Sequence, residues 1–359
     1  MTNKLKEYFP MIRTRKEILE YIEVRPELQE VFESWREERQ EEFLDFCCGA
    51  RGIKILYDSF FKEIFNPELY PERLESLLSL LLGKEVKIKQ VLPNDSVRLA
   101  DESTLLITDI VVEFEDGILA NIEVQKIGYS FPGQRIACYS ADLLLRQYKR
   151  VKARKKKFTY RNMKKVYTIV LFEKSTEEFH KCKDCYVHHS EHVFDSGLNL
   201  ETLQEYVLIA LDIFQEVVHN KGIENELDAW LTFISCDEPE RMIELMEKYP
   251  QFKAMYQNLY DMCLNVEGVM EMFSKELREL DRNTVQYMIE EQEKELERKK
   301  KEVEAKKEEV EQKKKEIEQK KKEIEQKTQE NEELKMEVEE LKEKMKFLTA
   351  QLEAVVKTD

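Results

Sequence analysis

The pattern of apolar and polar positions predicts a mixed α/β protein with a long helical end. Apolar side chains at helical spacing predict helices over residues 14–46 (interrupted at Pro26), 58–65, 72–82, 134–150 and parts of 213–287. Unbroken apolar runs predict strands over residues 86–92, 166–172 and 206–211. Strand, hairpin, helix and strand follow one another, so the predicted fold class is α/β, with a mixed sheet flanked by helices.

The stretch LLITDIVVEFEDGILANIEVQ, residues 105–125, predicts a β-hairpin. Two runs rich in Val, Ile and Leu flank Glu115, Asp116 and Gly117, and Gly117 can adopt the positive φ that a three-residue loop requires. In this register Phe114 lies opposite Ile118.

Three polar side chains interrupt this apolar hairpin, and the register predicts that they share one face. Asp109 falls opposite Glu123, and Gln125 points the same way as Glu123 because strand side chains alternate. Two carboxylates facing each other are unfavourable unless something positive lies between them, and a divalent cation meets that need. A solvated sheet edge is the alternative, since the face of Leu119, Asn121, Glu123 and Gln125 could be open to water.

The last part of the chain carries a seven-residue repeat from Leu296 to Leu352, with Asn331 at one of its apolar positions. The positions three residues further on are lysines until Leu334, so full apolar pairing is limited to residues 331–356. We expect a short coiled coil there, and Asn331 favours a parallel homodimer in register. The preceding EIEQKKK units predict a solvated stalk helix with many Glu to Lys pairs, and one long charged helix without a partner is the alternative.

The net charge of the chain and the local charge of its segments lead to different expectations about a nucleic-acid partner. The chain has a formal net charge of −16, which by itself argues against a nucleic-acid partner. Residues 143–172, however, hold eleven Lys or Arg and no acid. Within them, residues 149–165 interleave Phe158 and Tyr160 with cations such as Lys155, Lys156 and Lys157. We expect this run to form a loop that binds DNA phosphates. A solubilising loop is the alternative.

The seven cysteines form an odd set without a disulfide framework, which suits reduced thiols. Neither a signal peptide nor an apolar run long enough to span a membrane is evident, so we expect a cytoplasmic protein without a membrane partner. The segment HKCKDCYVHHSEH offers Cys182, Cys185 and His188 as zinc ligands, although no second CxxC accompanies it.

Four segments in order carry a family resemblance: DSFFKEIF, TDIVVEFEDG, NIEVQ and PGQRIACYSADLLLRQ. Together they resemble the Rpn family of recombination-promoting nucleases and transposases, a branch of the PD-(D/E)XK nuclease superfamily, over roughly residues 10–215. The resemblance implies a Mg²⁺-dependent DNA endonuclease core with a mixed sheet flanked by helices.

The resemblance also implies roles for individual residues of the hairpin. Asp109 and Glu123 look like the metal ligands, and Gln125 stands where the superfamily usually has Lys. Gln carries no positive charge, so transition-state stabilisation would depend on the metal and on Lys126 or Lys62.

Two helices supply further candidates from the same resemblance. Asp58 resembles an additional family acid, and the alternative for it is a local ion pair with Lys62 one turn away. Arg135 and Tyr139 match the helix that follows the hairpin, with core packing as their alternative.

The sequence therefore predicts four parts: a helical lead-in over 1–50, a PD-(D/E)XK nuclease-like core over 51–215, a helical subdomain over 216–289, and a charged stalk with a coiled coil over 290–359. The predicted function is Mg²⁺-dependent DNA cleavage in recombination or transposition. Two alternatives remain at this point: a catalytically inactive DNA-binding descendant of the nuclease fold, and a coiled-coil interaction protein.

Overall fold

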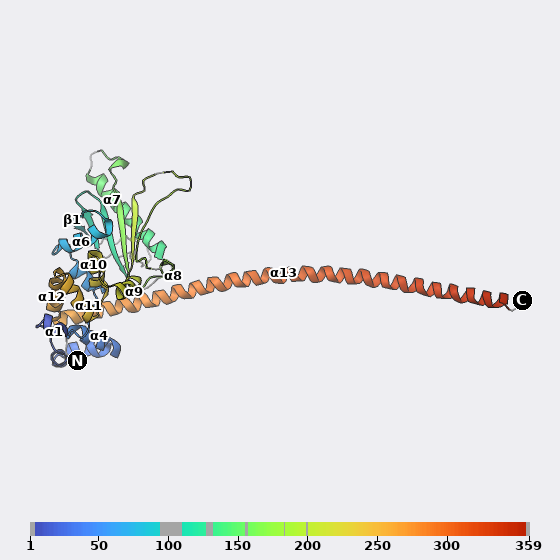
Figure 1. Ribbon diagram of the computed structural model, residues 1–359, viewed down its shortest axis with the longest axis horizontal. Helices are drawn as coiled ribbons and strands as arrows, with labels where there is room; N and C mark the ends of the chain where they lie inside the picture. Colours follow the sequence, from blue (N-terminus) through green and yellow to red (C-terminus); the bar gives the residue numbers. More distant parts are fainter. Residues whose placement is uncertain are drawn as a thin grey trace. The chain divides into compact units, whose positions relative to one another are not determined.

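The computed structural model describes residues 4–93, 110–126, 132–154, 157–182, 184–198 and 200–356. The chain divides into two compact units, Met1–Glu290 and Glu291–Asp359. The first unit contains a mixed sheet with helices around it (Figure 1). Among the described residues, no helix is both long and apolar enough to cross a lipid bilayer.

The sheet is built from strands β1 (Ile88–Leu92), β2 (Ile110–Phe114), β3 (Leu119–Gln125), β4 (Val166–Phe172), β5 (Val187–His189) and β6 (Gln204–Ala210). Their order across the sheet is β1-β2-β3-β4-β6-β5. The central pairs β3–β4 and β4–β6 are parallel, and the remaining pairs are antiparallel. The predicted mixed sheet is therefore confirmed.

The hairpin of β2 and β3 has the predicted register. Phe114 donates its backbone N–H to the carbonyl oxygen of Ile118 at 2.8 Å, and Ile110 lies opposite Ile122. Gly117 has a φ of 85°, a conformation that costs an L-residue with a Cβ about 1–2 kcal/mol. The three-residue loop with glycine in its last position thus fixes which face each β3 side chain takes.

The helices of the first unit precede, interrupt and follow the strands. They are α1 (Lys4–Tyr8), α2 (Arg15–Glu23), α3 (Pro26–Ser34), α4 (Glu37–Cys47), α5 (Asp58–Ile64), α6 (Pro71–Leu82), α7 (Pro132–Arg154), η1 (Tyr160–Asn162), α8 (Glu177–His180), α9 (Leu211–Lys221), α10 (Glu226–Ser235), α11 (Pro239–Lys248), α12 (Gln251–Cys263) and the beginning of α13 (Val266–Val356). Residues 14–46, predicted as two helices, form three, because the chain is extended at Trp35 and Arg36.

The two faces of the sheet are covered differently. One face, with Val112, Ala120, Ile169 and Ile209, belongs to the main core, which also includes residues of the helices α1–α6 and α9–α13. The other face is covered by α7 (Figure 1), whose Ile136 and Leu143 join two smaller clusters of sheet residues. The N-terminal helices and the helices after β6 therefore share a single core with the sheet.

Helix α13 contributes Phe273 to the centre of that core. This fully buried ring lies 5.0 Å from the ring of Trp35, and the rings of Phe43, Phe46 and Tyr57 surround it at 5.5–5.9 Å between centroids. Large aromatic side chains packed in this way dominate core energetics. The first turns of α13 are thereby part of the globular unit.

The second unit consists of α13 from residue 291 onward. The predicted Glu to Lys pairs are present along it, for example Glu302–Lys306 at 3.0 Å and Glu309–Lys313 at 2.6 Å. The heptad residues Val303, Ile317 and Leu341 are each more than half exposed in the single chain. One side of this helix therefore carries a regular apolar stripe.

We predict that Phe273→Ala lowers the free energy of unfolding by about 3–5 kcal/mol, because it removes a buried ring and leaves a cavity. Urea unfolding followed by the fluorescence of the two tryptophans, of which Trp35 contacts Phe273, measures this change. Leu264→Ala is the matched control, since Leu264 is 39% exposed in the turn between α12 and α13 and should change stability by less than about 1 kcal/mol. Equal losses in the two variants would contradict this account of the core.

Candidate active site

The polar face of β3 is buried. Glu123 is 8% exposed, Gln125 is 5% exposed and Asn121 is fully buried. The alternative interpretation of this face as a solvated edge is thus wrong, because α7 covers it. A buried carboxylate and two buried amides on one strand are costly unless each is hydrogen-bonded or serves a function.

Helix α7 places Tyr139 and Arg135 over Glu123. Burial and the negative charge of Glu123, together with a hydrogen bond between the two side chains, raise the pKa of the Tyr139 hydroxyl. Arg135 donates from Nη2 to the Tyr139 hydroxyl oxygen at 3.2 Å. Tyr139 is buried, as packing would require, and it also links Arg135 to the Glu123 carboxylate. The structure therefore brings Glu123, Tyr139 and Arg135 together.

A polar layer continues one step further along the strands. Asn121 is paired in the parallel register with Thr168 of β4, and both are fully buried. Within the described part of the chain, neither the Asn121 amide nor the Thr168 hydroxyl has a hydrogen-bond partner. Each orphaned group costs about 1–3 kcal/mol, which a strand chosen only for stability would avoid. This cost is typical of a functional region.

The carboxyl end of β3 is tied to α5 and α13 through Glu276. This glutamate is 1% exposed, pairs with the ammonium of Lys126 and accepts the backbone N–H of Asp58 at 2.9 Å. The side chain of Lys126 is only 9% exposed in this pair. Lys126 is thus part of a buried ion pair, and its suggested part in transition-state stabilisation stays a prediction.

Asp58 forms the ion pair with Lys62 that was its alternative interpretation. The Lys62 ammonium lies 2.7 Å from Oδ1 of Asp58, and both side chains are about one third exposed or less. Through Glu276 the same aspartate lies close to the strand end that carries Gln125 and Lys126. Asp58 is therefore both ion-paired and near the candidate site.

Glu173 adds a carboxyl group at the same edge of the sheet. It follows β4, and its backbone N–H donates to the carbonyl oxygen of Gln125 at 2.9 Å. Burial raises the pKa of the Glu173 carboxyl, while the charges of Lys54 and Lys126 oppose that shift. No motif or periodicity around position 173 points to this residue.

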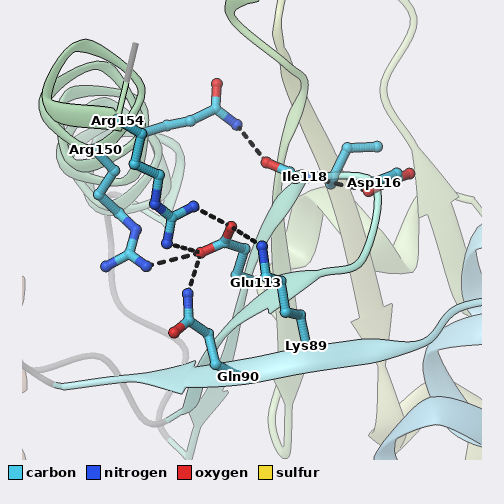
Figure 2. Close-up of polar contacts among 9 residues, drawn as sticks. Lys89, Gln90, Glu113, Asp116, Ile118, Arg150 and Arg154 are labelled. Atoms are coloured by element: carbon cyan, nitrogen blue, oxygen red, sulfur yellow. Dashed lines mark hydrogen bonds and ion pairs between the residues drawn. The ribbon is translucent and has the colours of Figure 1, made fainter.

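Glu113 of β2 fixes the far end of α7 to the sheet. Its carboxylate accepts hydrogen bonds from Arg150 at 2.7 Å and from Arg154 at 2.5 and 3.1 Å, and also from Gln90, while Lys89 lies at 3.6 Å (Figure 2). Burial works against the charged form, yet these partners lower the pKa of Glu113 to about 2. Several charge-assisted bonds thus outweigh the desolvation of one buried carboxylate.

The basic run differs from its prediction in two ways. Helix α7 continues to Arg154, so the first part of the run is helical and not a loop. Two of its arginines, Arg150 and Arg154, are partly neutralised by Glu113. Lys157 is exposed, whereas Lys155 and Lys156 lie outside the described residues.

Asp109 also lies outside the described residues, so its predicted role as a metal ligand stays a prediction. In the described part of the chain, no three His, Cys, Asp or Glu side chains gather closely enough to hold a metal ion. Cys182, Cys185 and His188 therefore form no such group, although Cys185 Sγ lies 3.9 Å from His188 Nδ1. Glu123 and Gln125 nevertheless offer the oxygen donors that Mg²⁺ prefers.

Sequence reasoning missed Glu113 and Glu276, although each has a recognisable signal. Glu113 interrupts the apolar run of β2 at a position that shares a sheet face with the buried Val111. Residues 143–172 contain many cations and no acid, so their counter-charge must come from another part of the chain. Glu276 lies three residues after Phe273 and therefore falls on the buried side of α13. An acid at a core position predicts a buried cation.

Comparison with known proteins identifies one family. The model of the PD-(D/E)XK nuclease family transposases matches residues 55–289, which is more than half of the chain. No curated protein and no solved structure matches the chain. The match includes the sheet, α7 and the helices α9–α12, and it extends to Glu276 on α13.

We predict that Glu113→Gln destabilises the protein by roughly 1–3 kcal/mol at pH 7 and has little effect near pH 2. The folded-state pKa of about 2 lies below the ordinary 4.5, so the stabilisation is complete above about pH 5 and is lost as the pH falls toward 2. Urea unfolding of both proteins between pH 7 and pH 3 measures the difference. Glu115→Gln, an exposed residue of the same hairpin, is the control. A difference that does not depend on pH would contradict the ion-pair account.

Proposed function

The chain belongs to the PD-(D/E)XK nuclease family transposases, and on that premise we propose that it is a Mg²⁺-dependent DNA endonuclease acting in recombination or transposition. The single observation that carries the proposal is the buried Glu123–Gln125 pair on a covered sheet face, with Tyr139 and Arg135 above it. The chain belongs to a nuclease family, and a carboxylate and an amide are ligands suited to Mg²⁺. Together these facts favour metal-assisted phosphodiester hydrolysis over a purely structural role.

Glu123 and Gln125 would hold the metal together with Asp109, whose role comes from the sequence. When bound, Mg²⁺ supplies Lewis-acid polarisation of the scissile phosphate and lowers the pKa of a bound water. Glu123 offers a carboxylate as ligand, and the hydrogen bond with Tyr139 holds that carboxylate in one orientation. A fixed carboxylate loses less conformational entropy when it coordinates an ion.

We propose that Arg135 meets the substrate phosphate. Its guanidinium is half-buried beside Tyr139, to whose hydroxyl oxygen it donates, and it stands on α7 above Glu123. Guanidinium groups bind phosphate oxygens with two parallel hydrogen bonds. We therefore assign to Arg135 the charge stabilisation that the superfamily usually obtains from the lysine at the position of Gln125.

DNA is the proposed substrate because of the family and the surface charge together. Lys149, Lys152, Lys157, Arg161 and Lys164 are exposed along the end of α7 and the segment after it. Such a basic run binds the phosphate backbone without reading sequence.

We predict that Glu123→Gln reduces the nicking of supercoiled plasmid DNA in Mg²⁺ by roughly 100-fold or more, because it removes a charged ligand from the proposed metal site. Asp109→Asn should have a comparable effect. The measurement is the initial rate of conversion to open-circular DNA, and Glu115→Gln is the matched control because that glutamate is exposed in the hairpin loop.

DNA binding and DNA cleavage by the unsubstituted chain distinguish this proposal from its alternatives. Binding of DNA without cleavage would indicate an inactive descendant, consistent with Gln125 in place of the lysine. Absence of both binding and cleavage would indicate an interaction protein. Cleavage that survives in Glu123→Gln would contradict the assignment of the metal site.

We propose further that residues 331–356 form a parallel homodimeric coiled coil, which would suit the cutting of two DNA strands. The exposed heptad residues Leu334, Val338, Leu341, Met345 and Leu348 support this, since a stripe of this length is buried only against a second helix.

The full chain should have the mass of a dimer by light scattering, and a chain ending at Glu290 should be monomeric. Asn331→Val tests the register, because an a-position Asn favours dimers at a cost in stability: the variant should be more heat-stable and less uniform in oligomeric state. A truncated chain that is still dimeric would place the interface elsewhere.

A further inference from the structure

Three aromatic rings gather where α7 ends and η1 begins. Tyr148 and Tyr160 are nearly parallel, with an interplanar angle of 20° and 6.4 Å between centroids. Phe158 stands edge-on to both, at 5.2 Å from Tyr148 and 5.3 Å from Tyr160. The three rings therefore support one another in a fixed arrangement, which we call the aromatic platform.

Tyr160 is the exposed member of the platform, with 78% of its surface open to solvent. Its backbone is held by a capping box, in which Thr159 donates its N–H to Asn162 Oδ1 at 3.1 Å. An exposed ring at a fixed position contributes little to the core, since burial and not exposure stabilises aromatic side chains. A rigid π-face of this kind loses little conformational entropy when a planar ligand stacks on it.

The surroundings of the platform are cationic. The ammonium of Lys152 lies 5.4 Å from the centroid of the Tyr148 ring and donates to its hydroxyl oxygen at 3.3 Å. Lys157 and Arg161, the neighbours of Phe158 and Tyr160 in sequence, are exposed. Glu113 is satisfied by Arg150 and Arg154, which leaves these other cations of the run for a ligand. An anionic ligand with flat rings is complementary to such a surface.

The position of the platform along α7 relates it to the candidate active site. Tyr139 and Tyr148 lie nine residues apart on this helix, a rise of roughly 14 Å. The two positions are about two and a half turns apart, so they project from opposite sides of α7, and the platform is a contact separate from the candidate active site.

We propose that Tyr160, supported by Phe158 and Tyr148, stacks on an unpaired nucleobase of the DNA substrate while the adjacent lysines contact its phosphates. Every base has a π-face, so stacking is tolerant of sequence, whereas bases in an intact duplex already stack on one another. The substrate class is thus DNA with a single-stranded segment or end. The inference rests on the proposed function in taking DNA as substrate, but it does not require cleavage.

The test is the binding of a fluorescent single-stranded thymidine oligonucleotide to the full-length chain in EDTA, without Mg²⁺. An oligonucleotide of the same length with abasic sites in place of the bases is measured beside it. Tyr160→Ala should weaken binding of the thymidine strand by about 5- to 100-fold, in the range of stacking by one base, and leave the abasic strand nearly unchanged. Tyr160→Phe keeps the ring and should bind both strands like the parent.

Lys157→Gln serves as the contrasting variant, since the loss of a phosphate contact should weaken both strands alike and reduce the salt dependence. The inference is overturned if Tyr160→Ala binds both strands like the parent, or loses affinity for both equally. It is also overturned if the parent binds duplex DNA and the thymidine strand equally and Tyr160→Ala weakens both to the same extent. A parent that binds the thymidine strand through Tyr160 but never cleaves DNA would retain the platform and remove only the proposed endonuclease activity.

Discussion

The position of α7 over a partly polar sheet face is the constraint on which the candidate site depends. That face contains Glu123, Gln125 and Asn121, so covering it with a helix removes charged and polar groups from water at considerable cost. The bonds from Arg150 and Arg154 to Glu113 hold one end of the helix to β2. With that end fixed, Tyr139 stands over Glu123 as a consequence of helix geometry. The ion pairs at Glu113 thus position a residue three turns away.

A second buried ion pair joins the helical part of the first unit to the sheet. Glu276 of α13 contacts Lys126 and Asp58, the first residue of α5. Lys126 follows the candidate Gln125 directly, and Asp58 is itself a candidate site residue. Removing either charge would leave the other buried without compensation, which is strongly destabilising. This pairing gives a physical reason why the family match continues past the last strand to residue 289. Helix α13 therefore contacts the candidate site as well as the core.

Local sequence patterns were sufficient to predict the hairpin and the buried strand, because neighbouring residues determine these elements. Gly117 and the flanking apolar runs fixed the hairpin and its register, and the continuous apolar run at residues 166–172 is β4 with the same bounds. The burial of the polar β3 face was not predictable, because periodicity shows which side chains share a face and not what covers it. The same holds for Glu113 and Glu276, whose partners are distant in sequence. Residues in the basic run looked uniformly available, and only the fold shows that two arginines are engaged.

The balance of charge around Gln125 follows from these contacts. Superfamily members usually have a lysine at that position, and here the next residue, Lys126, is a cation whose charge is offset by Glu276. A second ammonium at position 125 would add an uncompensated charge to a face that is 5% exposed there, and its desolvation would be costly. An amide avoids that cost and still offers an oxygen to a metal. In the proposed active site, positive charge for a phosphate would come from Arg135 of α7, which is partly buried and donates to the Tyr139 hydroxyl. Under that proposal, the helix that covers the candidate site also supplies its cation.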